Sequence, residues 1–347
     1  AHATASRQRR FWALALVPVL VIGVVLAIWV SQTQARESAA GTPTATATGT
    51  ATQPPAQTTL AMIADFGNCG PGAQRVADMI DTWDAAAVTT AGDNTYNDDP
   101  TCTPFTDSVG DFYGDWVEDP EGPRFWPALG NHDYEDKDAG LEKYRAYFTY
   151  LPTEADPQQR WYDVKVDGIH LFILDNDAPD ADLAAQQVWL RERLAASRAQ
   201  DPAAWNVVIF HKPAFTSASH PDEVEMRPDA GWDYRGWGAD VVIAGHQHAY
   251  EDVVVDGMHY VTAGIATNGL ERGGCDDELT DGSRLCLTGV EGAMRLDFQP
   301  LWSLSTGEVI AHEALLRWDS PGAPVIGPSE FVATAEDSII AKLEWAK

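Results

Sequence analysis

Short apolar runs in this chain repeatedly end in an Asp, Asn or His, and this repetition restricts the fold more than any other feature. The run Ala85 to Thr90 has the length and composition of a buried parallel strand, and Gly92-Asp93 follows it. Four further runs are Leu60 to Ala64, Phe125 to Leu129, Val207 to Phe210 and Val241 to Ala244. They are followed by Asp65, Asn131, His211 and the pair His246 and His248. Because α/β proteins place their sites at the carboxyl ends of parallel strands, we expect these side chains to cluster at one edge of a sheet.

Such a set of Asp, Asn and His side chains is typical of a two-metal site. Two ions ~3.5 to 4 Å apart need a shared anionic ligand and separate ligands on either side. Each residue alone has a simpler interpretation, because Gly-Asp is a common turn and a single His after a strand is more often a hydrogen-bonded core residue. We apply that simpler interpretation to His170, His259 and His312.

The order of these elements resembles the binuclear, calcineurin-like metallophosphoesterase superfamily, whose pattern runs D-x-G, G-D-x-x-Y, G-N-H-D/E, H and G-H-x-H. The matching segments here are Asp65-Phe66-Gly67, Gly92 to Tyr96, Gly130 to Asp133, His211, and Gly245 to His248. The resemblance extends over about residues 58 to 318. Tyr96, three residues after Asp93, resembles the purple acid phosphatase branch (tartrate-resistant acid phosphatase-like), in which a tyrosinate binds a ferric ion.

The resemblance implies a set of metal ligands in which Asp93 bridges two ions. Fe(III) would be bound by Asp65, Asp93, Tyr96 and His248. Zn(II), Mn(II) or Fe(II) would be bound by Asp93, Asn131, His211 and His246. The ligand chemistry agrees, because oxygen anions suit a hard ferric ion and imidazoles suit the softer divalent ions.

The implied reaction is hydrolysis of a small phosphate ester by attack of a metal-bound hydroxide. By resemblance, His132 donates a proton to the leaving group or contacts the phosphate. His220, nine residues after His211, is a second candidate, with a spacing similar to that of the small mammalian-type purple acid phosphatases. Asp133 is expected to orient His132 by accepting a hydrogen bond.

The substrate class is left open by these motifs. We expect a phosphomonoesterase, and the alternatives are a phosphodiesterase acting on envelope, nucleotide or lipid phosphodiesters and a non-catalytic surface binding module. Tyr250-Glu251-Asp252 stands where the family often has Tyr-Glu-Arg, so the pocket departs from the common pattern. The formal net charge of -29 argues against binding a nucleic acid as a polyanion.

The first 57 residues predict a membrane anchor and a tether. Residues 1–10 are basic, with Arg7, Arg9 and Arg10, and residues 11–30 are uncharged and long enough to span a hydrocarbon core of ~30 Å. We therefore expect an uncleaved signal anchor, a basic cytoplasmic end and a catalytic domain at the cell surface. A cleaved signal peptide, giving a secreted protein, is the alternative. Residues 31–57 are rich in Thr, Ala and Pro and predict a disordered tether.

Four cysteines in an exported domain suggest two disulfides, with three possible connectivities. We favour Cys69 with Cys102 and Cys275 with Cys286; zinc binding, the alternative, has no C-x-x-C spacing to support it.

The expected fold over residues 58–318 is α/β: an αββα sandwich of two mixed β-sheets flanked by helices. Asp167-Gly168 and Asp256-Gly257 predict hairpins. Residues 319–347 are interpreted as a tail that ends in a short helix.

Overall fold

The computed structural model describes residues 58–96, 100–134, 139–177, 180–218, 220–264, 284–287, 293–302, 309–319 and 345–346. All of them belong to one of two compact units of the chain, Pro55–Lys347. The predicted membrane anchor at 11–30 and the tether at 31–57 lie outside the described residues. Among the helices that are described, none combines the length and hydropathy needed to cross a membrane.

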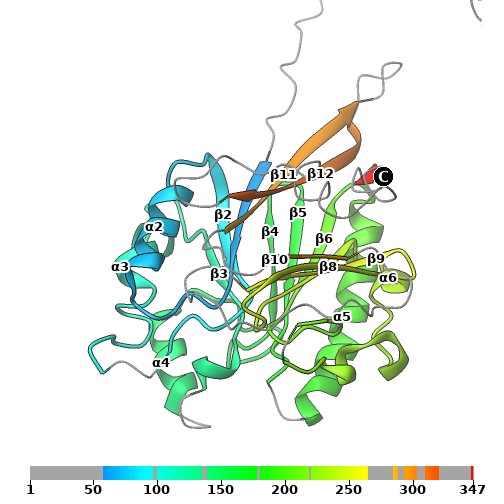
Figure 1. The fold of residues 1–347 in the computed structure, drawn as a ribbon. Coiled ribbons are helices and arrows are strands. Elements are labelled where there is room, and N and C mark those ends of the chain that lie inside the picture. The colour runs from blue at the N-terminus through cyan, green and yellow to red at the C-terminus, as the bar shows by residue number, and fades with distance from the viewer. Residues whose placement is uncertain are drawn as a thin grey trace, which may run out of the picture. The chain divides into compact units, whose positions relative to one another are not determined.

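Two mixed β-sheets form the centre of this unit (Figure 1). The first sheet has the order β13-β12-β11-β1-β2-β3 and the second the order β10-β8-β9-β7-β6-β5-β4. The first consists of β1 (Thr58–Ile63), β2 (Ala85–Thr90), β3 (Phe125–Pro127), β11 (Ala293–Trp302), β12 (Val309–Asp319) and β13 (Trp345–Ala346). The second consists of β4 (Tyr162–Val166), β5 (Ile169–Ile173), β6 (Trp205–Ile209), β7 (Val241–Ala244), β8 (Tyr250–Val255), β9 (Met258–Ala263) and β10 (Arg284–Leu287).

Parallel pairing places the important strand ends on the same edge. In the first sheet β1, β2 and β3 are parallel neighbours, and in the second β5, β6, β7 and β9 are. Antiparallel strands flank both groups. The predicted pair of mixed sheets is confirmed.

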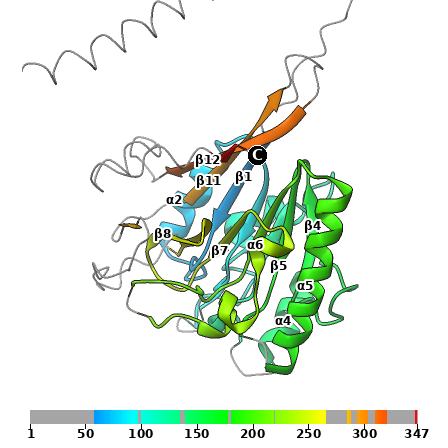
Figure 2. The ribbon, with the colours of Figure 1, turned by 90° about the vertical axis from the view of Figure 1, so that its right-hand side faces the viewer.

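Helices cover the outer faces of both sheets (Figures 1 and 2). The hydrophobic residues of α2 (Pro71–Ile80), α3 (Gly110–Val117) and α4 (Ala139–Tyr147) pack in one cluster with the first sheet. Those of α5 (Asp180–Gln200) and α6 (Tyr234–Trp237) pack against the second. Short 3-10 helices are η1 (Asn131–Asp133), η2 (Val224–Met226) and η3 (Pro228–Ala230).

Strand β6 shows why the sheet strands read as continuous apolar runs. Val207 and Ile209 belong to the core between the two sheets, whereas Val208 and Phe210 belong to the core beneath α5. Successive side chains of a strand point to opposite faces, and here both faces are buried. Each such side chain contributes roughly 1.5 to 3 kcal/mol by leaving water. An amphipathic alternation is therefore absent from β6.

Near the end of the chain, Trp345–Ala346 form the two-residue strand β13, which pairs antiparallel with β12 at Glu313 and Ala314. The short helix predicted for the tail stays a prediction, because residues 320–344 lie outside the described residues. Both predicted hairpins form, β4 with β5 and β8 with β9. In the second, Asp256 and Gly257 have φ of 51° and 74°, as a type I′ turn requires.

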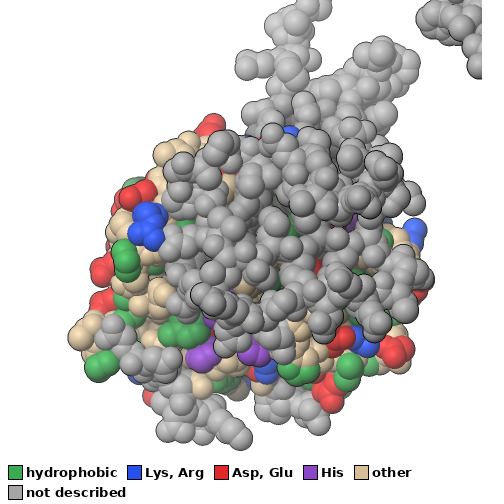
Figure 3. All heavy atoms as spheres, in the orientation of Figure 1, with side chains coloured by type: hydrophobic (Ala, Val, Ile, Leu, Met, Phe, Trp, Pro, Cys, Tyr) green, Lys and Arg blue, Asp and Glu red, His purple; other side chains and the backbone are tan. Residues whose placement is uncertain are grey.

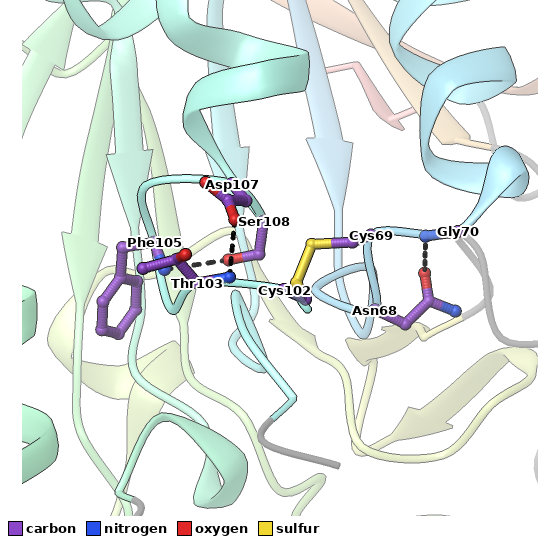
Figure 4. The surroundings of a disulfide bond; sticks show 8 residues. All are labelled: Asn68, Cys69, Gly70, Cys102, Thr103, Phe105, Asp107 and Ser108. Atoms are coloured by element: carbon purple, nitrogen blue, oxygen red, sulfur yellow. Dashed lines mark hydrogen bonds between the residues drawn. A yellow bond between two sulfur atoms is a disulfide. The ribbon is translucent and has the colours of Figure 1, made fainter. Parts of the chain in front are cut away.

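The predicted disulfide between Cys69 and Cys102 is present (Figure 4), with the two Cα atoms 5.9 Å apart. It joins the loop after β1 to the segment before α3. On either side, the Asn68 side chain accepts a hydrogen bond from the Gly70 amide at 3.0 Å, and Asp107 accepts one from the Thr103 amide at 2.8 Å. The second predicted pair involves Cys275, which lies outside the described residues.

Candidate metal centre

The seven predicted ligands all come from the loops that follow the parallel strands. Asp65 follows β1, Asp93 and Tyr96 follow β2, and Asn131 opens η1 after β3. His211 follows β6, and His246 and His248 follow β7. The structure brings all seven into one connected group, as the distances below show. In Figure 3, histidine side chains reach the surface near the lower edge of the described part of the molecule.

Asp65, Tyr96 and His248 form one half of the group. The Tyr96 hydroxyl lies 3.3 Å from His248 Nε2, and the same nitrogen lies 3.6 Å from Asp65 Oδ1. Asp65 is fully buried and Tyr96 is nearly so. Two oxygen ligands and an imidazole thus face one another, and they are three of the four ligands predicted for the ferric ion.

Asp93, Asn131 and His211 form the other half. His211 Nε2 lies 3.3 Å from Asp93 Oδ1 and 3.1 Å from Asn131 Oδ1. The other ring nitrogen, Nδ1, lies 2.8 Å from the Ala91 carbonyl oxygen, which can only accept, so Nδ1 carries a proton. In its neutral form the ring presents a lone pair at Nε2, as a metal ligand must. The His246 ring stands 5.0 Å from the His211 ring, centroid to centroid.

The backbone is held in an uncommon conformation where it delivers these side chains. Asp65, Asp93 and His246 have φ of 56°, 53° and 68°, in the left-handed region that costs non-glycine residues ~1 to 3 kcal/mol. Hydrogen bonds offset this cost: the Asp65 amide donates to the Gly92 carbonyl at 3.1 Å, and the His246 amide donates to Asp65 Oδ2 at 2.9 Å. At Gly92, φ is 90° and a Cβ would lie 2.5 Å from His211 Nδ1, so only glycine fits.

The electrostatics of the group favour a cation. Burial raises the pKa of Asp65 and would lower that of His211. The charge of Asp93 and its contact with His211 outweigh burial and raise the pKa of His211 to about 10. Burial and the nearby His211 and His220 lower the pKa of His246 to about 3, which leaves that ring neutral. The negative charge that retains a proton on His211 would retain a metal ion instead, with release of the proton.

The residues present fit a metal centre by the chemistry of their donor atoms. Asp65, Asp93 and His211 each offer one ligand atom, all three atoms lie within 4.8 Å of one another, and all three residues are buried. In the second half of the group, the proton retained on His211 Nε2 stands between that nitrogen, a carboxylate oxygen and an amide oxygen, and once it is released three lone pairs point at one another. Such an arrangement is unfavourable in a buried place unless a cation occupies the point where the lone pairs meet.

The predicted acid-base residues lie beside this group. The His132 ring is exposed and packs on the Tyr96 ring at 4.5 Å between centroids, and the His132 amide donates to Asp93 Oδ1 at 2.9 Å. The His220 ring lies 4.6 Å from the His246 ring. These positions put one histidine next to each predicted metal site.

Asp133 has a clear structural function. Its buried carboxylate accepts hydrogen bonds from the Gly130 amide at 2.8 Å, the Thr95 amide at 3.0 Å and the Asn94 side chain at 2.8 Å. Burial raises its pKa well above the ordinary value. The carboxylate thus joins the loop after β2 to the loop after β3; the orientation of His132 by Asp133 stays a prediction.

Sequence reasoning missed three residues that shape the loops. Asn94 is fully buried and donates to Asp133 and to the Ala128 carbonyl while accepting from Thr90. Glu251 accepts hydrogen bonds from Thr216 and Ser217. Gln247 bonds to the His220 backbone. The available signal was their position inside or next to a motif, in G-D-N-x-Y, G-H-Q-H and Y-E-D.

Comparison with known proteins agrees with this geometry. The chain belongs to the calcineurin-like phosphoesterase family, whose sequence model matches residues 58–250, more than half of the chain. A model of the EAL domain matches only residues 288–345. Within that range β11 and β12 complete the first sheet, so these strands belong to the phosphoesterase fold.

Relatives of this chain include phosphatases. The chain is 29% identical over 209 residues to a phosphoenolpyruvate phosphatase of Allium cepa, covering 57% of this chain and 42% of the relative. It is 27% identical over 208 residues to purple acid phosphatase 18 of Arabidopsis thaliana, covering 57% and 46%. The chain therefore spans less than half the length of these relatives. A purple acid phosphatase from yellow lupin (Lupinus luteus) seeds has the same fold, with a TM-score of 0.60, 16% identity, and coverage of 79% of this chain and 53% of that one.

Proposed function

We propose that this protein hydrolyses phosphomonoesters at a two-metal centre of the purple acid phosphatase type. The observation that carries the proposal is the convergence of three potential ligand atoms, Asp93 Oδ1, Asn131 Oδ1 and His211 Nε2, beside the second set of Asp65, Tyr96 and His248. Two bound cations would supply a nucleophile from water at neutral pH and would neutralise the charge of the phosphoryl group.

The ligands divide between two sites in this proposal. Asp65, Tyr96 and His248 would hold Fe(III), Asn131, His211 and His246 would hold Zn(II), Mn(II) or Fe(II), and Asp93 would serve both sites. His211 keeps its Nε2 available because Nδ1 donates to Ala91. The protein's own net charge is strongly negative, so the phosphate would be attracted by the centre and not by the surface as a whole.

In this proposal His132 acts on the leaving group and His220 on the phosphoryl group. His132 is exposed, and its backbone is tied to Asp93 while its ring rests on Tyr96, so the ring is available to a substrate that enters from solvent. It would give a proton to the leaving alkoxide. His220, beside His246, would contact the phosphate oxygens.

The cellular setting belongs to the same proposal. We infer from residues 1–57 that a signal anchor holds the catalytic domain outside the membrane on a tether. The substrate is then a small phosphate ester outside the cytoplasm. Fusion of a reporter enzyme to the carboxyl end, with activity assayed in intact and permeabilised cells, tests this orientation.

The function is tested by turnover with paired substrates. The full chain, purified in detergent and loaded with iron plus zinc, is expected to hydrolyse an aryl phosphomonoester faster than the matching diester. A preference for the diester would move the function to a phosphodiesterase, and absence of turnover with both metals bound would favour a binding module.

Tyr96 provides a spectroscopic test of the ferric site. A tyrosinate bound to iron gives a visible charge-transfer band, which Tyr96→Phe should remove. Tyr162→Phe is the matched control, because Tyr162 is fully buried and bonded to the Pro127 carbonyl. Colour that persists in Tyr96→Phe would refute the assignment of this ligand.

A further inference from the structure

The side chain between the two histidines of the His-x-His turn makes an unusual pair of hydrogen bonds. Gln247 is fully buried. Its Nε2 donates to the His220 carbonyl at 2.8 Å, and its Oε1 accepts from the His220 amide at 3.0 Å. One side-chain amide therefore satisfies both backbone groups of a single loop residue, much as a neighbouring strand would.

This pairing fixes a residue that has no regular secondary structure of its own. His220 lies in the loop after β6, yet its ring stands 4.6 Å from the ring of His246, the residue before Gln247. The turn that presents two predicted metal ligands thus also holds the residue predicted to contact the phosphate. A shift of Gln247 would move the His220 ring relative to His246.

A second contact holds the start of the same loop. Glu251, fully buried in β8, accepts from the Thr216 hydroxyl at 2.7 Å and from the Ser217 amide at 3.0 Å. The Thr216 hydroxyl in turn accepts from the Ala218 amide at 3.0 Å. With Glu251 holding residues 216–217 and Gln247 holding residue 220, the loop is attached at two points to the segment that follows β7.

We propose that Gln247 is a positioning residue that fixes the His220 ring where it acts on substrate at the metal centre. The inference rests on the proposed function, since it needs a substrate there. Small displacements matter because a misplacement of about 1 Å can lower a rate roughly a hundredfold. The role requires the middle residue of the motif to be a long amide, and Gln meets that requirement whereas an apolar side chain of the same length would not.

The test is a double-mutant cycle between Gln247 and His220 in the full, metal-loaded chain. Gln247→Met keeps the length and volume of the side chain and removes both hydrogen bonds. We expect His220→Ala to lower kcat/KM for an aryl phosphomonoester about a hundredfold and Gln247→Met roughly tenfold. When His220 is already Ala, adding Gln247→Met should lower kcat/KM by less than about twofold, because the ring that Gln247 positions is gone.

The chain offers a matched control for a merely structural effect. Gln186 in α5 is also fully buried, and its amide also bonds both backbone groups of one residue, accepting from the Asp175 amide at 2.9 Å and donating to the Asp175 carbonyl at 2.8 Å. The factor by which Gln186→Met alone lowers kcat/KM should be unchanged when the same substitution is made in His220→Ala. If Gln247→Met lowers kcat/KM by the same factor in the presence and absence of the His220 side chain, the inference is wrong.

Two further measurements keep the test decisive. Gln247→Glu still accepts from the His220 amide but sets a carboxylate oxygen against the His220 carbonyl. If Gln247→Met folds poorly, Gln247→Glu replaces it in the cycle, and the same coupling in kcat/KM is expected. Affinity for inorganic phosphate, measured by calorimetry, does not require turnover. An inactive wild-type protein would refute the proposed function. The same double-mutant cycle, measured in phosphate affinity, would still show coupling between Gln247 and His220 if the inference holds, and additive effects if it is wrong.

Discussion

Two buried histidines, His211 at the candidate metal centre and His170 beneath α5, differ in what faces their ring nitrogens. His170 Nε2 lies 2.6 Å from Asp163 Oδ2 and its Nδ1 lies 2.8 Å from Ser197 Oγ. Ser197 donates onward to Asn206 Oδ1 at 2.8 Å, and the Asn206 amide is fixed by its bond to the Gly238 carbonyl. Each ring nitrogen of His170 thus faces one polar atom of a neighbouring side chain.

At His211 the pattern is different, because the proton of Nδ1 is committed to Ala91 and Nε2 faces two oxygens. The comparison teaches that residue types alone do not identify a site. Asp163, His170 and Ser197 resemble a hydrolase triad, yet Ser197 is buried and its proton points to Asn206, so it is a structural network. What distinguishes the candidate metal centre is an imidazole nitrogen that faces two oxygen acceptors, where a cation can bind in place of a proton.

Substitution of Asp93, the carboxylate predicted to serve both metal ions, should have the largest effect on activity. A small effect would contradict the distinction drawn between His211 and His170. Asp93→Asn replaces the bridging charge by a neutral amide, so we expect loss of bound metal and a fall in kcat/KM of at least about a thousandfold. Metal analysis and turnover of the purified variant measure this. The matched control is Asp163→Asn, which alters the carboxylate bonded to His170 and should leave metal content unchanged. Near-normal activity of Asp93→Asn would contradict the assignment.

The His170 network should respond in stability and not in chemistry. His170→Ala removes the ring that joins Asp163 to Ser197, and the loss of both hydrogen bonds, together with the cavity left by the ring, should lower the free energy of unfolding by about 3 kcal/mol. Urea unfolding measures the change, and turnover per folded molecule should be retained. Arg193→Gln is the control, because Arg193 also contacts Asp163 but its side chain is 47% exposed, so its loss should cost less than about 1 kcal/mol.

The sequence predicted those parts of the site that depend on local patterns. Strand β2 begins and ends where the apolar run does, at Ala85 and Thr90, because a strand buried on both faces must be apolar throughout. Parallel pairing then carries Asp65, Asp93 and Asn131 to one edge. The ligands could be named from the sequence because strand order and side-chain chemistry, both visible in the motifs, determine where they meet.

The remaining contacts could not be predicted because they depend on loop conformation. Gln247 reaches His220 across 27 positions, and Asn94 reaches Asp133 across 39. Asp252, where the family often has Arg, accepts from His259 Nδ1 at 3.0 Å, a contact between β8 and β9. The pairing of Trp345–Ala346 with β12 involves two residues, too few for any periodicity. Such contacts become visible only after the backbone has been placed.

Asp175 provides the smallest and most selective test, because it is a carboxylate connected to both regions. It follows β5, the strand of His170, and precedes Asn176, whose side chain accepts from the His211 amide at 3.2 Å. Burial raises the pKa of Asp175 to about 7, although the hydrogen bond from the Tyr134 hydroxyl opposes the shift. Between about pH 4 and pH 7, the folded protein therefore holds a proton that the unfolded chain has released, and stability falls as the pH rises.

Asp175→Asn should remove this dependence. The contribution of Asp175 is fully present below its unfolded pKa of 3.8 and is lost as the pH passes about 7. The variant should therefore gain on the order of 2 kcal/mol relative to wild type between pH 5 and pH 8, measured by urea unfolding of the metal-free protein. His170→Ala provides the contrast, because it should be destabilised at both pH values. An Asp175→Asn variant that lost stability relative to wild type on going from pH 5 to pH 8 would show that the bond from Tyr134 outweighs burial, and that Asp175 belongs with the satisfied network of His170.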